Sequence, residues 1–270
     1  MPGSLRPTQI DVYTRDGFVR CGRVFDDAEM DVVRAGIERV IENRPAGTAP
    51  EQIMNLHFDD AWLLELAAHP RILDAVESIL GPELSLFTTR ILSKSAGVGH
   101  PIPWHQDSNY WPLEPLRVVS FWLAIDDVDR DNGTMEVVPG SHTRGNLPTT
   151  TVETEDDRDF FLHIPEHAID VARALPVEIE AGEATLHDAF LVHRSIPNLS
   201  SRRRCVFIAR YVPGHTRIRP NDFPLFSNGY ELIPVRGGGA TALTRRRRGP
   251  RDRPGPGADP TLGRRSDAAQ

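Results

Sequence analysis

The spacing of hydrophobic residues changes once in this sequence, near Leu84, and that change limits the folds open to the chain. Upstream, apolar residues recur three or four positions apart, as on one face of a helix. Downstream, they form short runs separated by turns rich in Pro, Gly and Asn. We therefore expect a mainly β protein with flanking helices, an α+β fold in which the strands form a jelly roll.

Three helices and one short strand are expected upstream of the change. The first helix has Asp26 or Asp27 as its N-cap and ends before the turn at Arg44-Pro45. The others follow closely, and Gly81-Pro82 ends the last one. The strand spans 17–25, and the helices span about 27–43, 60–68 and 70–80.

Eight short strands are expected downstream. Strands of this number and length close into a barrel or pack as a sandwich, and the mouth of such a fold can hold a small molecule. The predicted strands span 84–93, 103–108, 117–125, 135–139, 175–179, 184–186, 192–193 and 205–212.

Length and composition fit one domain followed by a tail. A chain of 270 residues with 39% hydrophobic content can build a substantial core. We expect a single domain over 1–235, helical to about 82 and β over about 83–215. Residues 236–270 are rich in Arg, Gly and Pro and are expected to be disordered. The acidic segment 149–170 is either a lid or a solvated insertion, and the sequence favours neither.

Charge and cysteine content limit the binding partners and the cellular location expected for the protein. The net charge is −7 although the tail is basic, so the domain itself is acidic, which argues against nucleic acid as a partner. No apolar run is long enough to cross a membrane, and the two cysteines lie far apart. We expect a cytoplasmic protein that acts on a small molecule, as a monomer or dimer.

His105 and Asp107 are the first candidates for chemistry. In a strand, residues two apart lie on one face, so this pair could supply two ligands of a 2-His-1-carboxylate iron site. The composition alone predicts about 0.8 such His-x-Asp pairs by chance. The pair therefore needs support from elsewhere in the chain.

Support comes from a second histidine and an arginine. His193 ends one expected strand and Arg204 begins the next, so the turn between them would bring both side chains to one cavity. A guanidinium group binds a carboxylate through two parallel hydrogen bonds. This arrangement suits a metal ligand beside an anchor for a dicarboxylate such as 2-oxoglutarate.

Three ordered motifs give the chain a specific resemblance. They are WHQDSNYWPLEP, VVSFWLAIDDVDRDNGTMEVVPGSH and HRSIPNLSSRRR, at residues 104–115, 118–142 and 193–204. Together they resemble the phytanoyl-CoA dioxygenase family of Fe(II)/2-oxoglutarate-dependent oxygenases, whose fold is a cupin-like double-stranded β-helix. The family pattern places an arginine eleven residues after the distal histidine, which selects Arg204 over its two arginine neighbours.

The resemblance implies roles for individual residues. His105, Asp107 and His193 would bind Fe(II), and Arg204 would bind the distal carboxylate of 2-oxoglutarate. Three further residues could contact the co-substrate. Trp122 could instead be an ordinary core aromatic, and Thr134 could instead stabilise the neighbouring turn. Those three are Gln106, Trp122 and Thr134.

Three other residues are candidates for contact with substrate. Arg90 lies in the same region by analogy and could meet substrate or co-substrate, or form a surface ion pair instead. Tyr110 and Arg194 flank the ligands in sequence, where aromatic residues can equally be core.

His187 competes with His193 for the role of third ligand. The two are six residues apart, so both could point inward on one strand. The residue eleven positions after His187 is Asn198, which is not an arginine. We therefore predict that His193 is the ligand and His187 a packed neighbour.

The resemblance implies that the protein oxidises a C–H bond with O₂ while 2-oxoglutarate becomes succinate and CO₂. Hydroxylation of a small organic molecule in bacterial secondary metabolism, such as antibiotic biosynthesis, is the expected outcome. Cyclisation, desaturation and epimerisation remain alternatives, but the carboxylate of Asp107 argues against halogenation. A different alternative is a cupin-like metal- or ligand-binding protein without oxygenase activity.

Overall fold

Two antiparallel sheets form the centre of the protein in the computed structural model, which describes residues 3–97, 99–151, 162–219 and 231–238. The larger sheet has the strand order β1-β11-β6-β13-β3-β15, with β2 added beside β3. These strands are Phe18–Arg23, Glu183–Asp188, Val119–Ala124, Arg204–Pro213, Leu84–Lys94, Ile233–Arg236 and Ile53–Met54. The expected mainly β architecture with flanking helices is confirmed at this level.

The smaller sheet has the order β10-β7-β12-β4. Its strands are short, because a proline or glycine lies close to each of them in the sequence. They are Leu175–Pro176, Met135–Val137, His193–Ser195 and Ile102–His105. Two further pairs, β5 with β14 and β8 with β9, are Leu113–Glu114 with Arg217–Ile218 and Thr150–Thr151 with Leu162–His163.

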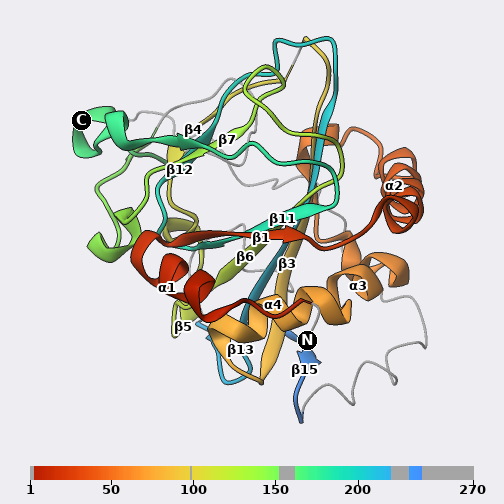
Figure 1. Ribbon diagram of the computed structural model, residues 1–270, viewed down its shortest axis with the longest axis horizontal. Coiled ribbons are helices and arrows are strands. Elements are labelled where there is room, and N and C mark those ends of the chain that lie inside the picture. Colours follow the sequence, from red (N-terminus) through yellow and green to blue (C-terminus); the bar gives the residue numbers. More distant parts are fainter. Residues whose placement is uncertain (1–2, 98, 152–161, 220–230, 239–270) are drawn as a thin grey trace, which may run out of the picture.

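Four helices cover one face of the larger sheet (Figure 1). They are α1 Pro7–Asp16, α2 Asp27–Glu42, α3 Ala61–Ala67 and α4 Pro70–Leu80. Asp26 caps α2 by accepting a hydrogen bond from the backbone of Glu29, as the sequence predicts. Helix α1 was not expected, because its apolar face is narrow and only Tyr13 is buried.

The strands of the larger sheet separate the helical layer from the interior between the sheets. On β13, Cys205, Phe207 and Ala209 pack with the helices. The alternate residues Val206 and Ile208 pack in the interior with residues of the smaller sheet. Every residue of β13 is buried, so both faces of this strand are in contact with protein.

Several expected boundaries require correction. The predicted strand 103–108 ends at His105, and a 3₁₀ turn, η3 (Asp107–Tyr110), begins at Asp107. The predicted strand 175–179 ends at Pro176, although Ile179 still forms an isolated bridge with Val128. Most of the predicted tail, and part of the segment 149–170 that could be a lid or an insertion, lie outside the described residues.

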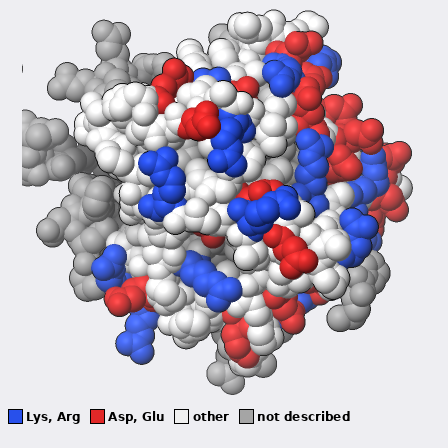
Figure 2. All heavy atoms as spheres, turned by 60° about the vertical axis from the view of Figure 1, so that its left-hand side comes forward, with Lys and Arg blue, Asp and Glu red and all other residues white. Residues whose placement is uncertain are grey.

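Many arginines near the surface are paired with acidic residues. Arg39 lies 2.6 Å from Asp60, and Arg203 lies 2.8 Å from Asp126. Basic and acidic side chains also lie next to one another on the face shown in Figure 2. Such exposed pairs contribute only about 0–1 kcal/mol each. Among the described helices, none is long and apolar enough to cross a membrane.

Candidate active site

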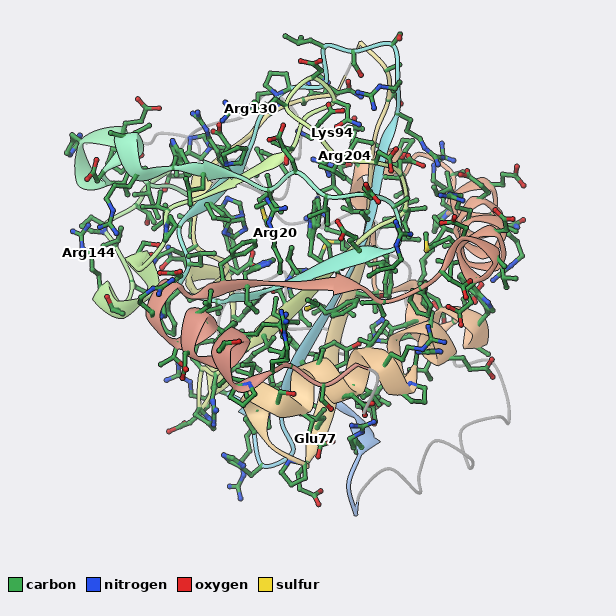
Figure 3. All side chains as sticks on the ribbon, in the orientation of Figure 1. Arg20, Glu77, Lys94, Arg130, Arg144 and Arg204 are labelled. Carbon is green, nitrogen blue, oxygen red and sulfur yellow. The ribbon has the colours of Figure 1, made fainter. Side chains whose placement is uncertain are left out.

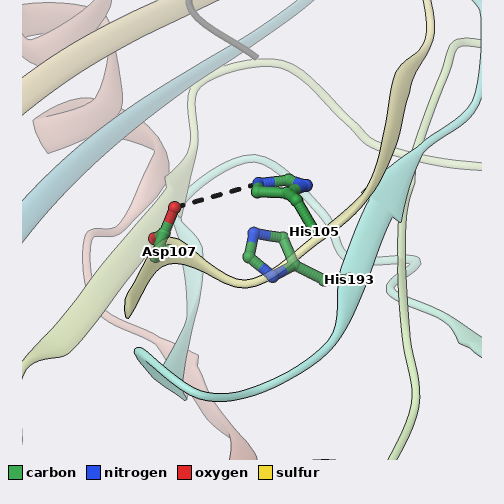
Figure 4. A group of neighbouring side chains, drawn as sticks. All are labelled: His105, Asp107 and His193. Atoms are coloured by element: carbon green, nitrogen blue, oxygen red, sulfur yellow. Dashed lines mark ion pairs between the residues drawn. The ribbon is translucent and has the colours of Figure 1, made fainter. Parts of the chain in front are cut away.

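Three buried side chains converge between the two sheets (Figure 4). His105 ends β4, Asp107 begins η3, and His193 begins β12. His105 and His193 are paired across the two strands, and one ligand atom from each of the three residues lies within 4.8 Å of the others. The backbone of Gln106, between His105 and Asp107, is extended. His105 and Asp107 therefore lie on the same face, as expected, although strand β4 has already ended.

Backbone carbonyls set the orientation of both histidine rings. Nδ1 of His105 donates to the carbonyl of Pro103 at 2.8 Å, and Nδ1 of His193 donates to that of Leu191 at 2.9 Å. The other nitrogen, Nε2, is then the atom that would bind a metal. Burial lowers the pKa of His105 to about 3 and also lowers the pKa of His193. Both rings are therefore neutral, as a metal ligand must be.

Asp107 is held in its ionised form. Burial alone would raise the pKa of Asp107, but Arg210 and the surrounding histidines outweigh burial and hold it below its usual range. Nε of Arg210 donates to Oδ2 at 3.2 Å, and the Ser120 hydroxyl donates to the same oxygen at 3.5 Å. Two neutral imidazoles and one carboxylate form the donor set of a non-haem Fe(II) site.

Arg204 lies inside the protein with one side of its guanidinium group unused. The residue is 1% exposed, and Nε and Nη2 both donate to the carbonyl of Gly133, at 3.1 and 2.6 Å. Nη1 has no hydrogen-bond partner among the described residues. Burial lowers the pKa of Arg204 only to about 10, so the group stays charged and suits an external carboxylate.

A cavity between the sheets joins the two histidines of the triad to Arg204. Its walls include His105, His193, Trp122, Arg90 and Arg204. The guanidinium of Arg204 lies 5.9 Å from the ring centre of Trp122. Of the predicted co-substrate residues, Trp122 and Arg204 are therefore brought together with the triad. Arg90 lines the same cavity and donates to the carbonyl of Glu51 at 3.0 Å.

Two predicted co-substrate residues lie elsewhere. The amide of Gln106 donates to the carbonyls of Gly145 and Phe190, and these hydrogen bonds hold the side chain away from the cavity. The hydroxyl of Thr134 donates to the carbonyl of Val177 at 2.5 Å. Neither residue is among the described residues that line the cavity, and both side chains tie loops together.

The two substrate candidates beside the ligands also make structural contacts. The hydroxyl of Tyr110 donates to the carbonyl of Leu162 and accepts from its backbone N–H. Nε of Arg194 donates to Glu136 at 2.6 Å, and the guanidinium lies over Trp104. Arg194 reaches the edge of the cavity, whereas Tyr110 is not among its described lining residues.

Sequence reasoning did not identify two buried basic residues and one hydroxyl at this site. Arg210 binds Asp107, and Lys94 lies beside Arg204 (Figure 3) and donates to the carbonyl of Ile196 at 2.6 Å. Burial and the neighbouring Arg204 lower the pKa of Lys94 to about 6. The hydroxyl of Ser195 lines the cavity and has no partner among the described residues. Each was detectable in the sequence only as an inward position on a strand.

A buried 2-His-1-carboxylate set within an antiparallel β scaffold defines the class of non-haem iron proteins. Within that class, the chain belongs to the phytanoyl-CoA dioxygenase (PhyH) family, whose pattern matches residues 13–206. The resemblance seen in the three motifs is thereby confirmed. The expected enzyme class is confirmed with it, an oxidoreductase that uses Fe(II), 2-oxoglutarate and O₂.

Individual relatives agree with this assignment. The chain is 26% identical over 255 residues to an L-proline trans-4-hydroxylase from Streptomyces griseoviridis, covering 83% of this chain and 93% of that protein. The structure resembles the non-heme monooxygenase ThoJ in its apo form, with 27% identity, a TM-score of 0.70, and coverage of 86% and 85%. It also resembles SnoK, a non-heme alpha ketoglutarate dependent carbocyclase from nogalamycin biosynthesis, with 25% identity, a TM-score of 0.64, and coverage of 81% and 88%.

Proposed function

We propose that this protein hydroxylates a C–H bond of a small organic molecule in bacterial secondary metabolism, with His105, Asp107 and His193 as its Fe(II) ligands. The observation that carries the proposal is a buried triad whose two histidines line one cavity together with a buried arginine that has an unused donor. The two sheets are proposed to form a double-stranded β-helix around this cavity. The proposed domain spans residues 1–235.

The residues of the cavity fit 2-oxoglutarate. Among the described residues, Arg204 donates only to the Gly133 carbonyl, so its buried charge would be stabilised by an anion from outside the protein. The open Nη1 of Arg204 and the Ser195 hydroxyl are donors that a dicarboxylate would satisfy. Trp122 would pack against the carbon chain, and Arg90 would contact co-substrate or substrate.

The protein contributes geometry and exclusion of water. When bound, Fe(II) together with 2-oxoglutarate and O₂ supplies the oxidising power to break an unactivated C–H bond. The two carbonyl-held histidines would present Nε2 to the metal, and Arg210 would keep Asp107 ionised. The apolar side chains around the cavity, among them Leu92 and Ile208, would keep bulk water away.

The direct test is formation of succinate from 2-oxoglutarate by the iron-loaded protein without added substrate. A slow, Fe(II)-dependent yield is expected, and His193→Ala should abolish it. If no succinate forms and no absorbance band develops when 2-oxoglutarate is added to the Fe(II) protein without O₂, the protein is a cupin-like binding protein instead. If succinate does form, a screen of metabolites for stimulated 2-oxoglutarate consumption would identify the substrate.

The mass of the product separates hydroxylation from the alternatives. Hydroxylation adds one oxygen atom, desaturation or cyclisation removes two hydrogen atoms, and epimerisation leaves the mass unchanged. Cyclisation is the second candidate, because the carbocyclase SnoK is among the structural relatives. We also propose a cytoplasmic location, since Cys21 and Cys205 are free thiols.

A further inference from the structure

The Asp107 carboxylate has a histidine on each side. Oδ1 lies 3.8 Å from Nε2 of His105, and Oδ2 lies 4.0 Å from Nε2 of His187. His187 is on β11 and is 1% exposed, so it is as deeply buried as the triad. By distance to the carboxylate alone, either histidine could share a metal ion with Asp107.

His193 lies within reach of both histidines. Its ring centre is 4.1 Å from that of His105 and 5.2 Å from that of His187. The site therefore contains a second potential set, His187, His193 and Oδ2 of Asp107. In the described part of the chain, only the set with His105 has its donor atoms within 4.8 Å of one another.

The main asymmetry between the two sides is a cation. Nε of Arg210 donates to Oδ2 at 3.2 Å, which is the oxygen that faces His187. Arg210 is 6% exposed, and its guanidinium lies 5.2 Å from the ring centre of Trp111, which limits its movement. An arginine does not lose its charge in a protein, so the guanidinium of Arg210 would always repel a divalent ion placed at Oδ2.

The histidine on that side also lacks the support that the ligands have. Nδ1 of His105 and of His193 donates to a backbone carbonyl. Nδ1 of His187 is buried and has no hydrogen-bond partner among the described residues. Nothing in the described structure therefore directs Nε2 of His187 toward a metal.

We propose that Arg210 is a positioning residue that holds Oδ2 of Asp107 and so reserves the metal for His105 and His193, excluding His187. The inference rests on the proposed iron site and extends it. The guanidinium orients Oδ1 toward His105 and at the same time occupies the place of the competing ion. The charge of the guanidinium, more than its size, makes the selection.

Co(II) binding, followed by its visible absorption without 2-oxoglutarate, tests this role independently of activity. His105→Ala should weaken Co(II) binding by about 100-fold or more. Adding Arg210→Met to His105→Ala should return the affinity to within about tenfold of wild type, because His187 can then replace the missing ligand. A third change, His187→Ala, should abolish this recovery.

A matched variant separates charge from shape. His105→Ala/Arg210→Lys keeps a cation near Oδ2 and should bind Co(II) as poorly as His105→Ala alone. If Arg210→Met does not fold by circular dichroism, Arg210→Gln removes the charge while keeping an N–H donor and should give the same recovery. The inference is overturned if folded, neutral variants at position 210 give no recovery.

The outcomes also distinguish this inference from the function on which it rests. If His105→Ala, Asp107→Ala and His193→Ala leave Co(II) affinity unchanged in the wild-type background, the proposed metal site is wrong. If they abolish binding and the neutral Arg210 variants restore none of it, only the selecting role of Arg210 is wrong.

Discussion

Strand β13 carries two buried arginines with different tasks, Arg204 at its first position and Arg210 further along it. Arg204 and Arg210 are six residues apart and point into the same interior. Arg204 donates to a neutral carbonyl and keeps one nitrogen unused, whereas Arg210 donates to the carboxylate of Asp107. Both residues are arginines on the same face of one strand, so residue type and strand face do not explain the difference. The group that each guanidinium contacts decides whether it can bind a ligand from outside or holds a side chain of the protein.

The largest expected effect concerns the metal beside Arg210. His193→Ala should abolish Fe(II) binding and activity, a loss greater than the roughly 10- to 100-fold typical of removing a group that only supports a ligand. His187→Ala is the matched control and should change metal affinity by less than about threefold. Isothermal titration with Mn(II) would measure both, and the opposite ranking would make His187 the ligand.

At the first residue of β13, Arg204→Ala should weaken 2-oxoglutarate binding by about 3–4 kcal/mol, a few hundredfold, because a buried charge-assisted contact is lost and the carboxylate is left unpaired. Arg203→Ala removes an adjacent, partly exposed arginine paired with Asp126 and should cost little. Equilibrium binding of 2-oxoglutarate to the Mn(II) protein measures both. Equal losses would mean that the eleven-residue spacing identifies the wrong arginine.

Removing Arg210 should affect the stability of the metal-free protein more than removing a surface arginine. Arg210→Met leaves Asp107 buried with Ser120 as a remaining donor, so we expect a loss of about 2–3 kcal/mol in unfolding free energy. Co(II) should restore part of it by neutralising the carboxylate. Arg202→Met, at an exposed pair with Asp129, should cost about 0–1 kcal/mol. Urea unfolding would show whether the two losses differ.

A pH-dependent effect on stability should come from Lys94, beside Arg204. The pKa of Lys94 is about 6 in the folded protein, below its usual value of 10.5, so between these pH values the unfolded chain binds the extra proton. Wild-type stability relative to Lys94→Met should therefore rise with pH, by at most about 1.4 kcal/mol per unit. Urea unfolding between about pH 6.5 and 9.5 measures this slope. A flat difference would mean that Lys94 keeps its proton in the fold.

Much of the fold follows from local pattern. The change of spacing near Leu84 correctly separates the helical part from the strands, and Asp26 is the predicted cap of α2. The pairing of β3 with β13 and β6 with β11 could not be predicted, because it joins segments far apart in the chain. Helix α1 was missed because few of its residues are buried.

The sequence by itself was enough to propose the ligands and the anion anchor, because His105-x-Asp107 and the eleven residues from His193 to Arg204 are local spacings that match the pattern of the resembled family. The tertiary structure alone decided the roles around them. Arg210 meets Asp107 across 103 residues, and Lys94 meets Ile196 across 102. Alternation along a strand shows which residues point inward, but which charge meets which oxygen depends on how distant strands pack.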